Sequence, residues 1–310
     1  MDKKPYLKGK KQVSKLGFGA WPLGNTAHGK TMSIEEGVAL VHKALEKEIN
    51  FFDTAPNYAL GRSETILGKA LEGRRENVVI NSKFGHHADG EINFDEVLIR
   101  PSIKESLKRL KTHYLDSVIL HNPAPDVLAG KTNHYKTLQA LKTEGIIHGY
   151  GVSIDTVEEL EIALAQNHLD VIELLFNVFS QSTRHLLDRI QAQGIALIIK
   201  VPLDSGWLGG RYHKDSIFTD IRSRWSASDR LRRHVLVENL KELTSDQALP
   251  KYALGFIWSY EAVTTIIPGI RSIEQLNEHI AASQWYFPDQ LKAQFEVFYD
   301  RHIKDNPLPW

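Results

Sequence analysis

The stretch NFFDTAPNYALGRSE, residues 50–64, changes character in its middle. Phe51 and Phe52 are aromatic, as in a buried strand, and the run ends on the acid Asp53. A kink at Pro56 and the phenol of Tyr58 follow, and residues 61–64 begin a helix-like segment. This unit of strand, loop and helix predicts an α/β protein that carries a carboxylate and a phenol where a buried strand ends.

The same alternation of strand and helix extends over nearly the whole chain. Two capping boxes, Ser33-Ile-Glu-Glu36 and Ser272-Ile-Glu-Gln275, mark helix starts. The strand candidates are short and apolar through their middles, which is typical of strands covered on both faces. Eight such strands, each followed by a helix, predict a single-domain (β/α)8 TIM barrel. They are residues 16–20, 51–53, 78–83, 117–121, 149–153, 171–177, 196–201 and 265–268.

A doubly wound parallel sheet is the alternative fold. Such a sheet normally carries a Gly-rich phosphate turn after its first strand, whereas Gly17-Phe-Gly19 leads here to Trp21-Pro22 and no helix. We therefore expect one barrel domain over residues 1–310, with a long loop at 203–230 and a C-terminal helix and tail at 288–310. Long loops in compact domains are usually functional.

The composition is that of an ordinary globular protein. Its 38 Lys and Arg residues balance 38 Asp and Glu residues, so no net field would attract nucleic acid or a membrane. The absence of cysteine excludes disulfides, thiolate nucleophiles and zinc-thiolate sites. The start lacks a signal-peptide pattern, and no apolar run reaches the about 18 residues of a membrane span. We expect a soluble, cytoplasmic protein that acts on a small molecule.

Proton-handling side chains end three consecutive predicted strands. Asp53 ends the second strand, with Tyr58 in its loop, Lys83 ends the third and His121 ends the fourth. The carboxyl ends of barrel strands meet at one mouth, so these four groups should converge. A lysine cation beside a phenol favours the phenolate, and a carboxylate behind the lysine keeps it charged. The set suits protonation of an oxygen while a nicotinamide delivers hydride to carbon.

A series of segments along the chain carries a family resemblance. They are FFDTAPNYALGRSETILGKAL (51–71), VINSKFG (79–85), LDSVILHNP (115–123), GVS (151–153), FNVFSQ (176–181), VPLDSGWLGGRY (201–212) and IIPGIRSIEQLNEHIAA (266–282). In these segments and in their order the sequence resembles the aldo-keto reductase family over nearly its whole length.

The resemblance implies a catalytic tetrad and a cofactor across the barrel mouth. Tyr58 would be the general acid/base, Lys83 and Asp53 would tune it, and His121 would orient the carbonyl. A guanidinium at Arg271 suits a 2′-phosphate, so NADP(H) is favoured over NAD(H). The remaining cofactor positions run from the nicotinamide end through the pyrophosphate loop to the adenosine end: Gly19, Ala20, Ser153, Glu173, Lys200, Pro202, Leu203, Gly206, Leu208, Gly269, Gln275 and Glu278.

Several positions depart from the family pattern around the nicotinamide. Ile154 follows the Ser of GVS, where Asn is common, and Glu173 replaces a Gln. A Tyr of the family's Tyr-Asn pair is Phe176 here, and Lys200 occupies the position of a Tyr that often stacks on the nicotinamide. Near the adenosine end, His279 stands in place of Asn. These changes alter the nicotinamide site while the tetrad is kept.

The predicted function is reduction of an aldehyde or ketone, or oxidation of the corresponding alcohol or sugar. A second hypothesis is a nicotinamide-binding redox-sensing partner protein with negligible catalysis, and a third is a metal-dependent barrel hydrolase. His86-His87 suggests metal, but no set of acids and histidines has metal spacing, so we expect no metal site.

Two further groups of residues remain to be placed. Trp21, Phe84 and His86 are candidates for the substrate wall. The arginines between 222 and 233 are interpreted first as a solvated face, second as a phosphate contact and third as a nucleic-acid contact.

Overall fold

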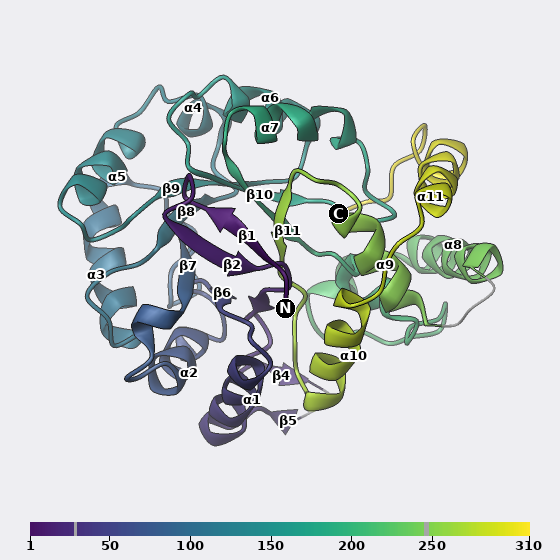
Figure 1. Cartoon of the computed structure of the whole chain (residues 1–310), viewed down its shortest axis with the longest axis horizontal. Helices are drawn as coiled ribbons and strands as arrows, with labels where there is room; N and C mark the ends of the chain where they lie inside the picture. Colours follow the sequence, from purple (N-terminus) through teal and green to yellow (C-terminus); the bar gives the residue numbers. More distant parts are fainter. Residues whose placement is uncertain (28–29, 245–247) are drawn as a thin grey trace.

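The computed structural model describes residues 1–27, 30–244 and 248–310, and it confirms the (β/α)8 barrel (Figure 1). Eight parallel strands form one sheet in the order β12-β11-β10-β9-β8-β7-β6-β3. Their short apolar sequences are buried throughout, as strands covered by helices on one face and a packed interior on the other require. The strands are β3 (Phe18–Gly19), β6 (Phe51–Asp53), β7 (Val79–Phe84), β8 (Ser117–His121), β9 (Tyr150–Ile154), β10 (Val171–Leu175), β11 (Ala196–Lys200) and β12 (Val263–Ile266).

Backbone contacts between the first and last strands close the barrel. The amide of Gly17 donates to the carbonyl of Ile266 at 2.8 Å, and that of Gly19 donates to Pro268 at 3.1 Å. A Cβ at Gly19 would lie 2.5 Å from the carbonyl oxygen of Ile267, so only glycine permits this approach. The first strand is shorter than the predicted 16–20 because only two of its residues pair in register with β6.

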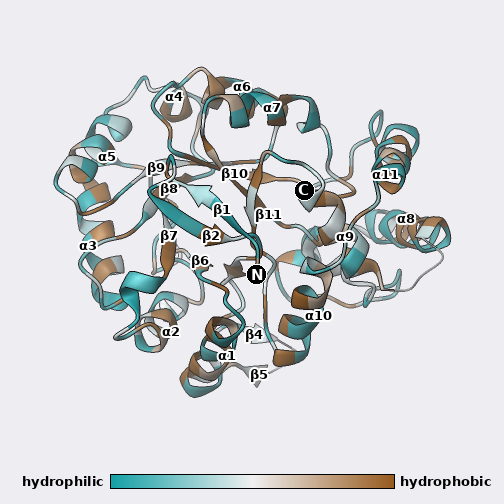
Figure 2. Cartoon of the chain, in the orientation of Figure 1, coloured by the Kyte–Doolittle hydropathy of each residue, from teal (hydrophilic) through white to brown (hydrophobic). Residues whose placement is uncertain are grey.

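Helices surround the barrel and turn their apolar sides toward it, with polar residues outward (Figure 2). Both predicted capping-box serines cap helices: Ser33 accepts from the amide of Glu36, and Ser272 accepts from that of Gln275. The helices are α1 (Ile34–Glu46), α2 (Arg62–Ala70), α3 (Ile99–Arg109), α4 (Pro125–Leu128), α5 (His134–Thr143), α6 (Val157–Leu164), α7 (Leu187–Ala192), α8 (Ala227–Thr244), α9 (Leu249–Trp258), α10 (Ile273–Ser283) and α11 (Asp289–His302).

An antiparallel hairpin that the sequence did not predict covers the amino end of the barrel. Strands β1 (Lys3–Tyr6) and β2 (Lys11–Ser14) lie across the barrel in Figure 1. Tyr6, Leu7 and Val13 are buried with interior residues of the strands, including Phe51 and Ile119. Because this hairpin plugs one end, the functional groups at the carboxyl ends of the strands face the other.

We expect Tyr6→Phe to lower the free energy of unfolding by about 1 kcal/mol. The buried Tyr6 hydroxyl lies 2.6 Å from Ser117 Oγ, and its loss leaves that oxygen with one partner fewer. Denaturant unfolding followed by circular dichroism measures the change. Tyr286→Phe is the matched control, since Tyr286 is 74% exposed. Equal stability of the two variants would contradict this role of the hairpin.

The long connection after β11 is ordered by a buried ion pair. Its start forms a 3-10 helix, η4 (Asp204–Gly209), and a second, η5 (Ile221–Arg224), precedes α8. Arg233 of α8 donates to Asp204 at 3.1 Å and to the carbonyl of Pro309 at 2.7 Å. The predicted long loop and C-terminal tail therefore pack together beside β11.

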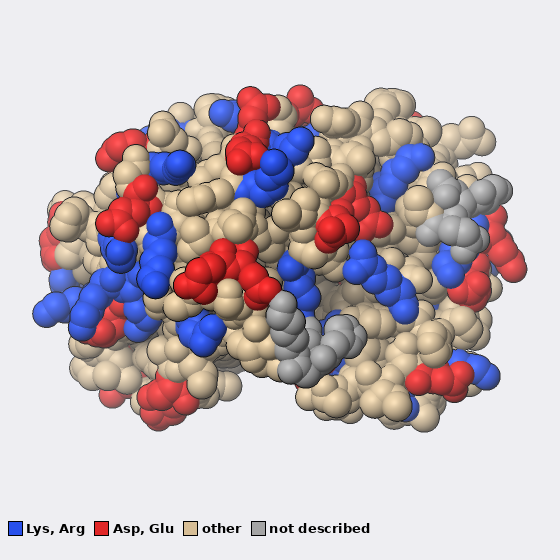
Figure 3. All heavy atoms as spheres, turned by 90° about the horizontal axis from the view of Figure 1, so that it is seen from below, with Lys and Arg blue, Asp and Glu red and all other residues tan. Residues whose placement is uncertain are grey.

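Charges of both signs are interspersed on the face seen in Figure 3, with no large patch of one sign. This distribution agrees with the balanced composition. Among the residues that the structure describes, no helix has the length and apolar character that crossing a bilayer requires.

Candidate active site

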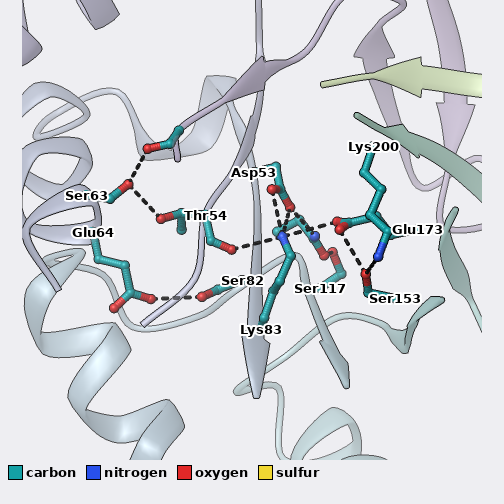
Figure 4. Close-up of polar contacts among 12 residues, drawn as sticks. Asp53, Thr54, Ser63, Glu64, Ser82, Lys83, Ser117, Ser153, Glu173 and Lys200 are labelled. Carbon is teal, nitrogen blue, oxygen red and sulfur yellow. Dashed lines mark hydrogen bonds and ion pairs between the residues drawn. The ribbon is translucent and has the colours of Figure 1, made fainter. Parts of the chain in front are cut away.

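The centre of the site is the ammonium of Lys83, at the carboxyl end of β7 (Figure 4). It donates to both carboxylate oxygens of Asp53, at 2.6 and 2.7 Å, and to the carbonyl of Thr54 at 3.2 Å. The Lys83 side chain is 0% exposed and that of Asp53 is 2% exposed. Burial opposes the charge of Lys83, but the nearby carboxylates outweigh it and raise the pKa of Lys83 above its usual value.

A hydrogen-bond chain behind Asp53 fixes its carboxylate, and the sequence reasoning missed it. Asn81 donates to Asp53 Oδ1 at 2.7 Å, and Ser117 donates to Asn81 Oδ1 at 2.6 Å. Asn81 precedes Lys83 by two positions on the same strand, so both side chains share the inner face. The two polar residues Asn81 and Ser82, directly before the lysine in a buried strand, were the signal that could have identified it.

Tyr58 lies in the loop after β6, as predicted, and faces Lys83 and His121. The Lys83 ammonium is 5.4 Å from the centre of the Tyr58 ring, and the His121 ring centre is 6.2 Å away in an edge-on arrangement. Burial raises the pKa of Tyr58 above its usual value, and the Lys83 cation only partly offsets this. The Lys83 charge does lower the pKa of Tyr58, as expected, but desolvation is the larger cause and raises this pKa in the free protein.

His121 ends β8 and is neutral. Burial, followed by the charges of Lys83, His86 and Lys200, lowers the pKa of His121 well below its usual value. His86 stacks on it at 4.1 Å between ring centres, and burial also lowers the pKa of His86. The Nδ1 of His121 is buried without a hydrogen-bond partner among the described residues. This neutral imidazole can exchange a hydrogen bond with a group bound in the mouth.

A second carboxylate reaches Lys83 from β10. Glu173 Oε2 lies 3.1 Å from Lys83 Nζ, and its Oε1 accepts from Ser153 at 3.1 Å. Burial and the charge of Glu173 together raise the pKa of Asp53 to about 7. Burial opposes ionisation of Glu173 as well, but the cations of Lys83 and Lys200 hold the pKa of Glu173 below its usual value.

Lys200 joins this group from β11, at the position where the family often has a stacking Tyr. Its ammonium donates to Ser153 Oγ at 2.8 Å and to Asn122 Oδ1 at 3.2 Å, and it lies 2.8 Å from Asp155 Oδ1. Glu173 and Lys200, which depart separately from the family pattern, therefore contact the same serine. Asn122 and Asp155 were not predicted, and they follow directly on the strands that end in His121 and Ile154.

The proposed pyrophosphate loop has a strained backbone. Asp204, Ser205 and Gly206 have φ angles of 45°, 52° and 104°, and Val201 has 53°. Left-handed conformations are costly for residues other than glycine and cluster at ligand-binding turns. The predicted residues Pro202, Leu203, Gly206 and Leu208 lie in or beside this turn, directly after Lys200. This turn is therefore a candidate ligand-binding loop.

The predicted adenosine end holds two arginines close together. Arg271 is half-buried and makes no ion pair among the residues that the structure describes; burial and the charge of Arg222 lower its pKa. A half-buried cation beside a second cation fits an anionic group such as a phosphate. Gln275 Oε1 accepts from the backbone amide of Arg271 at 2.9 Å, and Glu278 pairs with Arg211 at 3.6 Å. The first contact fixes Gln275 beside the backbone of Arg271, and the second brings Arg211 to Glu278 of α10.

The other predicted positions also lie around the carboxyl end of the barrel. Gly19 is bridged to Gly269, and the amide of Ala20 donates to Asp53. Of the substrate-wall candidates, Trp21 is 37% exposed and His86 is partly exposed, whereas Phe84 is fully buried in the core. Within the described residues, no three acids or histidines are arranged as metal ligands.

Comparison with known proteins identifies the family. The aldo/keto reductase family model matches residues 15–299, so the chain belongs to this family of nicotinamide-dependent oxidoreductases. A solved aldo-keto reductase from Bacillus halodurans, in its holo form, has a TM-score of 0.80 at 23% identity, with 97% of this chain and 99% of that chain covered.

Two curated relatives illustrate the range within the family. A probable voltage-gated potassium channel subunit beta of Oryza sativa subsp. japonica is 28% identical over 296 residues, which covers 87% of this chain and 88% of that protein. The NADH-specific methylglyoxal reductase of Escherichia coli (strain K12) is 26% identical over 292 residues, covering 87% and 90%.

Proposed function

We propose that the protein reduces the carbonyl of a small aldehyde or ketone with NADPH, or oxidises the corresponding alcohol or sugar, with Tyr58 as general acid/base. The observation that carries the proposal is the Lys83 ammonium, fixed by both oxygens of Asp53 and facing the Tyr58 ring. A nicotinamide, when bound, supplies or accepts the hydride at the substrate carbon.

The chain's own residues handle the proton. Tyr58 gives its hydroxyl proton to the substrate oxygen, and Lys83 stabilises the phenolate that remains. Burial raises the pKa of Tyr58, so the phenol is protonated at neutral pH, and the Lys83 cation, which lowers this pKa, favours loss of the proton to the substrate oxygen. His121, neutral because its pKa is lowered, orients the carbonyl through a hydrogen bond and does not act as the acid.

The test is a steady-state assay of NADPH and NADH with short aldehydes and aldoses. Consumption of cofactor that depends on the carbonyl compound supports the proposal. Tight NADPH binding with no consumption would instead support the redox-sensing alternative, which is not favoured because Asp53, Tyr58, Lys83 and His121 lie together. Activity that is lost to a chelator and is indifferent to nicotinamide would indicate the hydrolase.

We also propose that Arg271, with Arg222 beside it, holds the 2′-phosphate and favours NADPH. Arg271→Ala is expected to weaken NADPH binding roughly tenfold to hundredfold, since a hydrogen bond to a charged group is worth about 1.5–3 kcal/mol. NADH affinity should change little. Fluorescence titration of both cofactors measures this, with Arg100→Ala, which removes an exposed pair with Glu144, as control. An equal loss for both cofactors would contradict the assignment.

A further inference from the structure

We propose that Glu173, Ser153 and Lys200 form a proton path that connects Lys83, and through it Tyr58, with solvent at Asp155. The inference rests on the proposed role of Tyr58 as the acid. It assigns a shared purpose to two residues, Glu173 and Lys200, that depart from the family pattern.

The path is continuous in hydrogen bonds and ion pairs, and Figure 4 shows it from Lys83 to Lys200. Lys83 Nζ lies 3.1 Å from Glu173 Oε2. Ser153 Oγ donates to Glu173 Oε1 at 3.1 Å and accepts from Lys200 Nζ at 2.8 Å. Lys200 Nζ then lies 2.8 Å from Asp155 Oδ1. Every link is short enough for a proton to pass between neighbouring heavy atoms.

The inner part of the path, including Ser153 at 0% exposure, is buried, and the outer part is partly exposed. The side chain of Lys83 is 0% exposed and that of Glu173 is 2% exposed. Lys200 is 13% exposed and Asp155 is 23% exposed. The inner end is therefore shielded from water and the outer end reaches it. A Gln at position 173, as the family commonly has, cannot take up and release a proton as a carboxylate does.

The transfer balances in protons and moves no electrons along the path. In reduction, Tyr58 loses its proton to the substrate oxygen, and Lys83 returns one to the phenolate. Lys83 then takes up the proton that the Asp53–Glu173 pair holds. Ser153 passes a proton to Glu173 Oε1, which restores the proton of the pair, and receives one from Lys200, which takes a proton from the solvent beside Asp155. One proton enters from solvent for each alcohol formed, and oxidation runs the same steps in reverse.

The charges around Glu173 allow it to share a proton with Asp53. The two carboxylates flank one lysine, and the pKa of Asp53 is raised to about 7 by burial and by Glu173. Below about pH 7 the pair therefore holds one proton beside Lys83, mainly on Asp53, because the pKa of Glu173 is lowered. The titratable groups that interact with this pair are Tyr6, Tyr58, Lys83 and Lys200.

Infrared titration of the free protein, without any turnover, tests whether the Asp53–Glu173 pair holds a proton. Wild type is expected to show a buried protonated carboxyl that ionises near the Asp53 value of about 7. In Glu173→Gln this ionisation should move to lower pH, because the second carboxylate no longer raises the pKa of Asp53. Asp170→Asn, which removes a carboxylate just before the same strand, is the control. An unchanged titration in Glu173→Gln, or none in wild type, would overturn the proposal.

Buffer dependence of turnover tests the path. Ser153→Ala removes the hydroxyl between Glu173 and Lys200 at almost constant volume. Its reductive kcat should fall roughly hundredfold, the low end of the range for acid/base effects, and recover as imidazolium is added. Wild type and Asp170→Asn should be insensitive to buffer. A Ser153→Ala or Lys200→Met enzyme with unchanged, buffer-independent kcat and solvent isotope effect would overturn the path.

The two failures are distinguishable. If Tyr58→Phe retains turnover, the proposed function is wrong, because Tyr58 is then not the general acid. If Tyr58→Phe is inactive but Ser153→Ala keeps the wild-type buffer dependence, only the path is wrong, and the proton reaches Tyr58 directly from the mouth.

Discussion

Replacing Tyr58 with Phe is expected to lower kcat for carbonyl reduction by roughly 10²–10⁴-fold, the range for loss of a positioned general acid. The ring remains, so its packing near His121 should persist and NADPH should bind with unchanged affinity. No other acid takes over at neutral pH, because the pKa values of His121 and His86 are both lowered. Steady-state kinetics and a fluorescence titration on the same preparation separate the two effects.

The control for this substitution is Tyr286→Phe, which removes a phenol that is 74% exposed and outside the site. It should match wild type in kcat and in cofactor affinity. A Tyr58→Phe enzyme with kcat within about twofold of wild type would remove Tyr58 from the acid role.

Lys83→Met is expected to lower the free energy of unfolding by roughly 3–5 kcal/mol near neutral pH, besides abolishing turnover. The substitution leaves Asp53 and Glu173 facing each other, 2% exposed, without their shared cation. Breaking a buried ion pair by removing one partner is costly because the remaining charge stays desolvated. Urea unfolding of the free protein, monitored by fluorescence, measures the loss.

The stability lost in Lys83→Met should become smaller as the pH falls, because the two carboxylates then become protonated. Without Lys83, the pKa values of Asp53 and Glu173 in the folded state lie above their unfolded values. Protonation then favours the folded state, so the variant regains stability at acidic pH and loses it as pH rises through the folded pKa. Lys4→Met, which removes an exposed pair with Glu261, should cost about 1 kcal/mol or less. A Lys83→Met deficit no larger than that of Lys4→Met would contradict the buried charge balance.

The barrel and the meeting of the tetrad could be predicted because both follow from the strand period. Asp53, Lys83 and His121 each end an apolar run, and parallel strands in a barrel bring such ends to one mouth. The amino-terminal hairpin was missed because Lys3–Tyr6 and Lys11–Ser14 are mostly polar and carry no buried-strand pattern. Its contacts with the barrel interior come from only a few apolar side chains.

The electrostatics of the site could not be predicted from residue types alone. Pairwise reasoning expected Lys83 to lower the pKa of Tyr58, but burial, which depends on the whole fold, reverses the sign. Glu173 and Lys200 were recognised as departures, yet their contact through Ser153 depends on neighbouring strands β9, β10 and β11. The two departures from the family pattern thus add one buried acidic side chain, Glu173, and one basic side chain, Lys200, and their opposite charges keep the site balanced.

Isotope transfer tests the central claim most directly. The enzyme is incubated with NADPH carrying deuterium at the transferable nicotinamide position and with a short aldehyde, and the alcohol is examined by NMR. We predict one deuterium on the carbinol carbon with wild type and essentially none in the same time with Tyr58→Phe. Bound NADPH with no deuterium transfer to any carbonyl substrate, or equal transfer by the Tyr58→Phe variant, would contradict a reductase site built on Tyr58, Lys83 and Asp53.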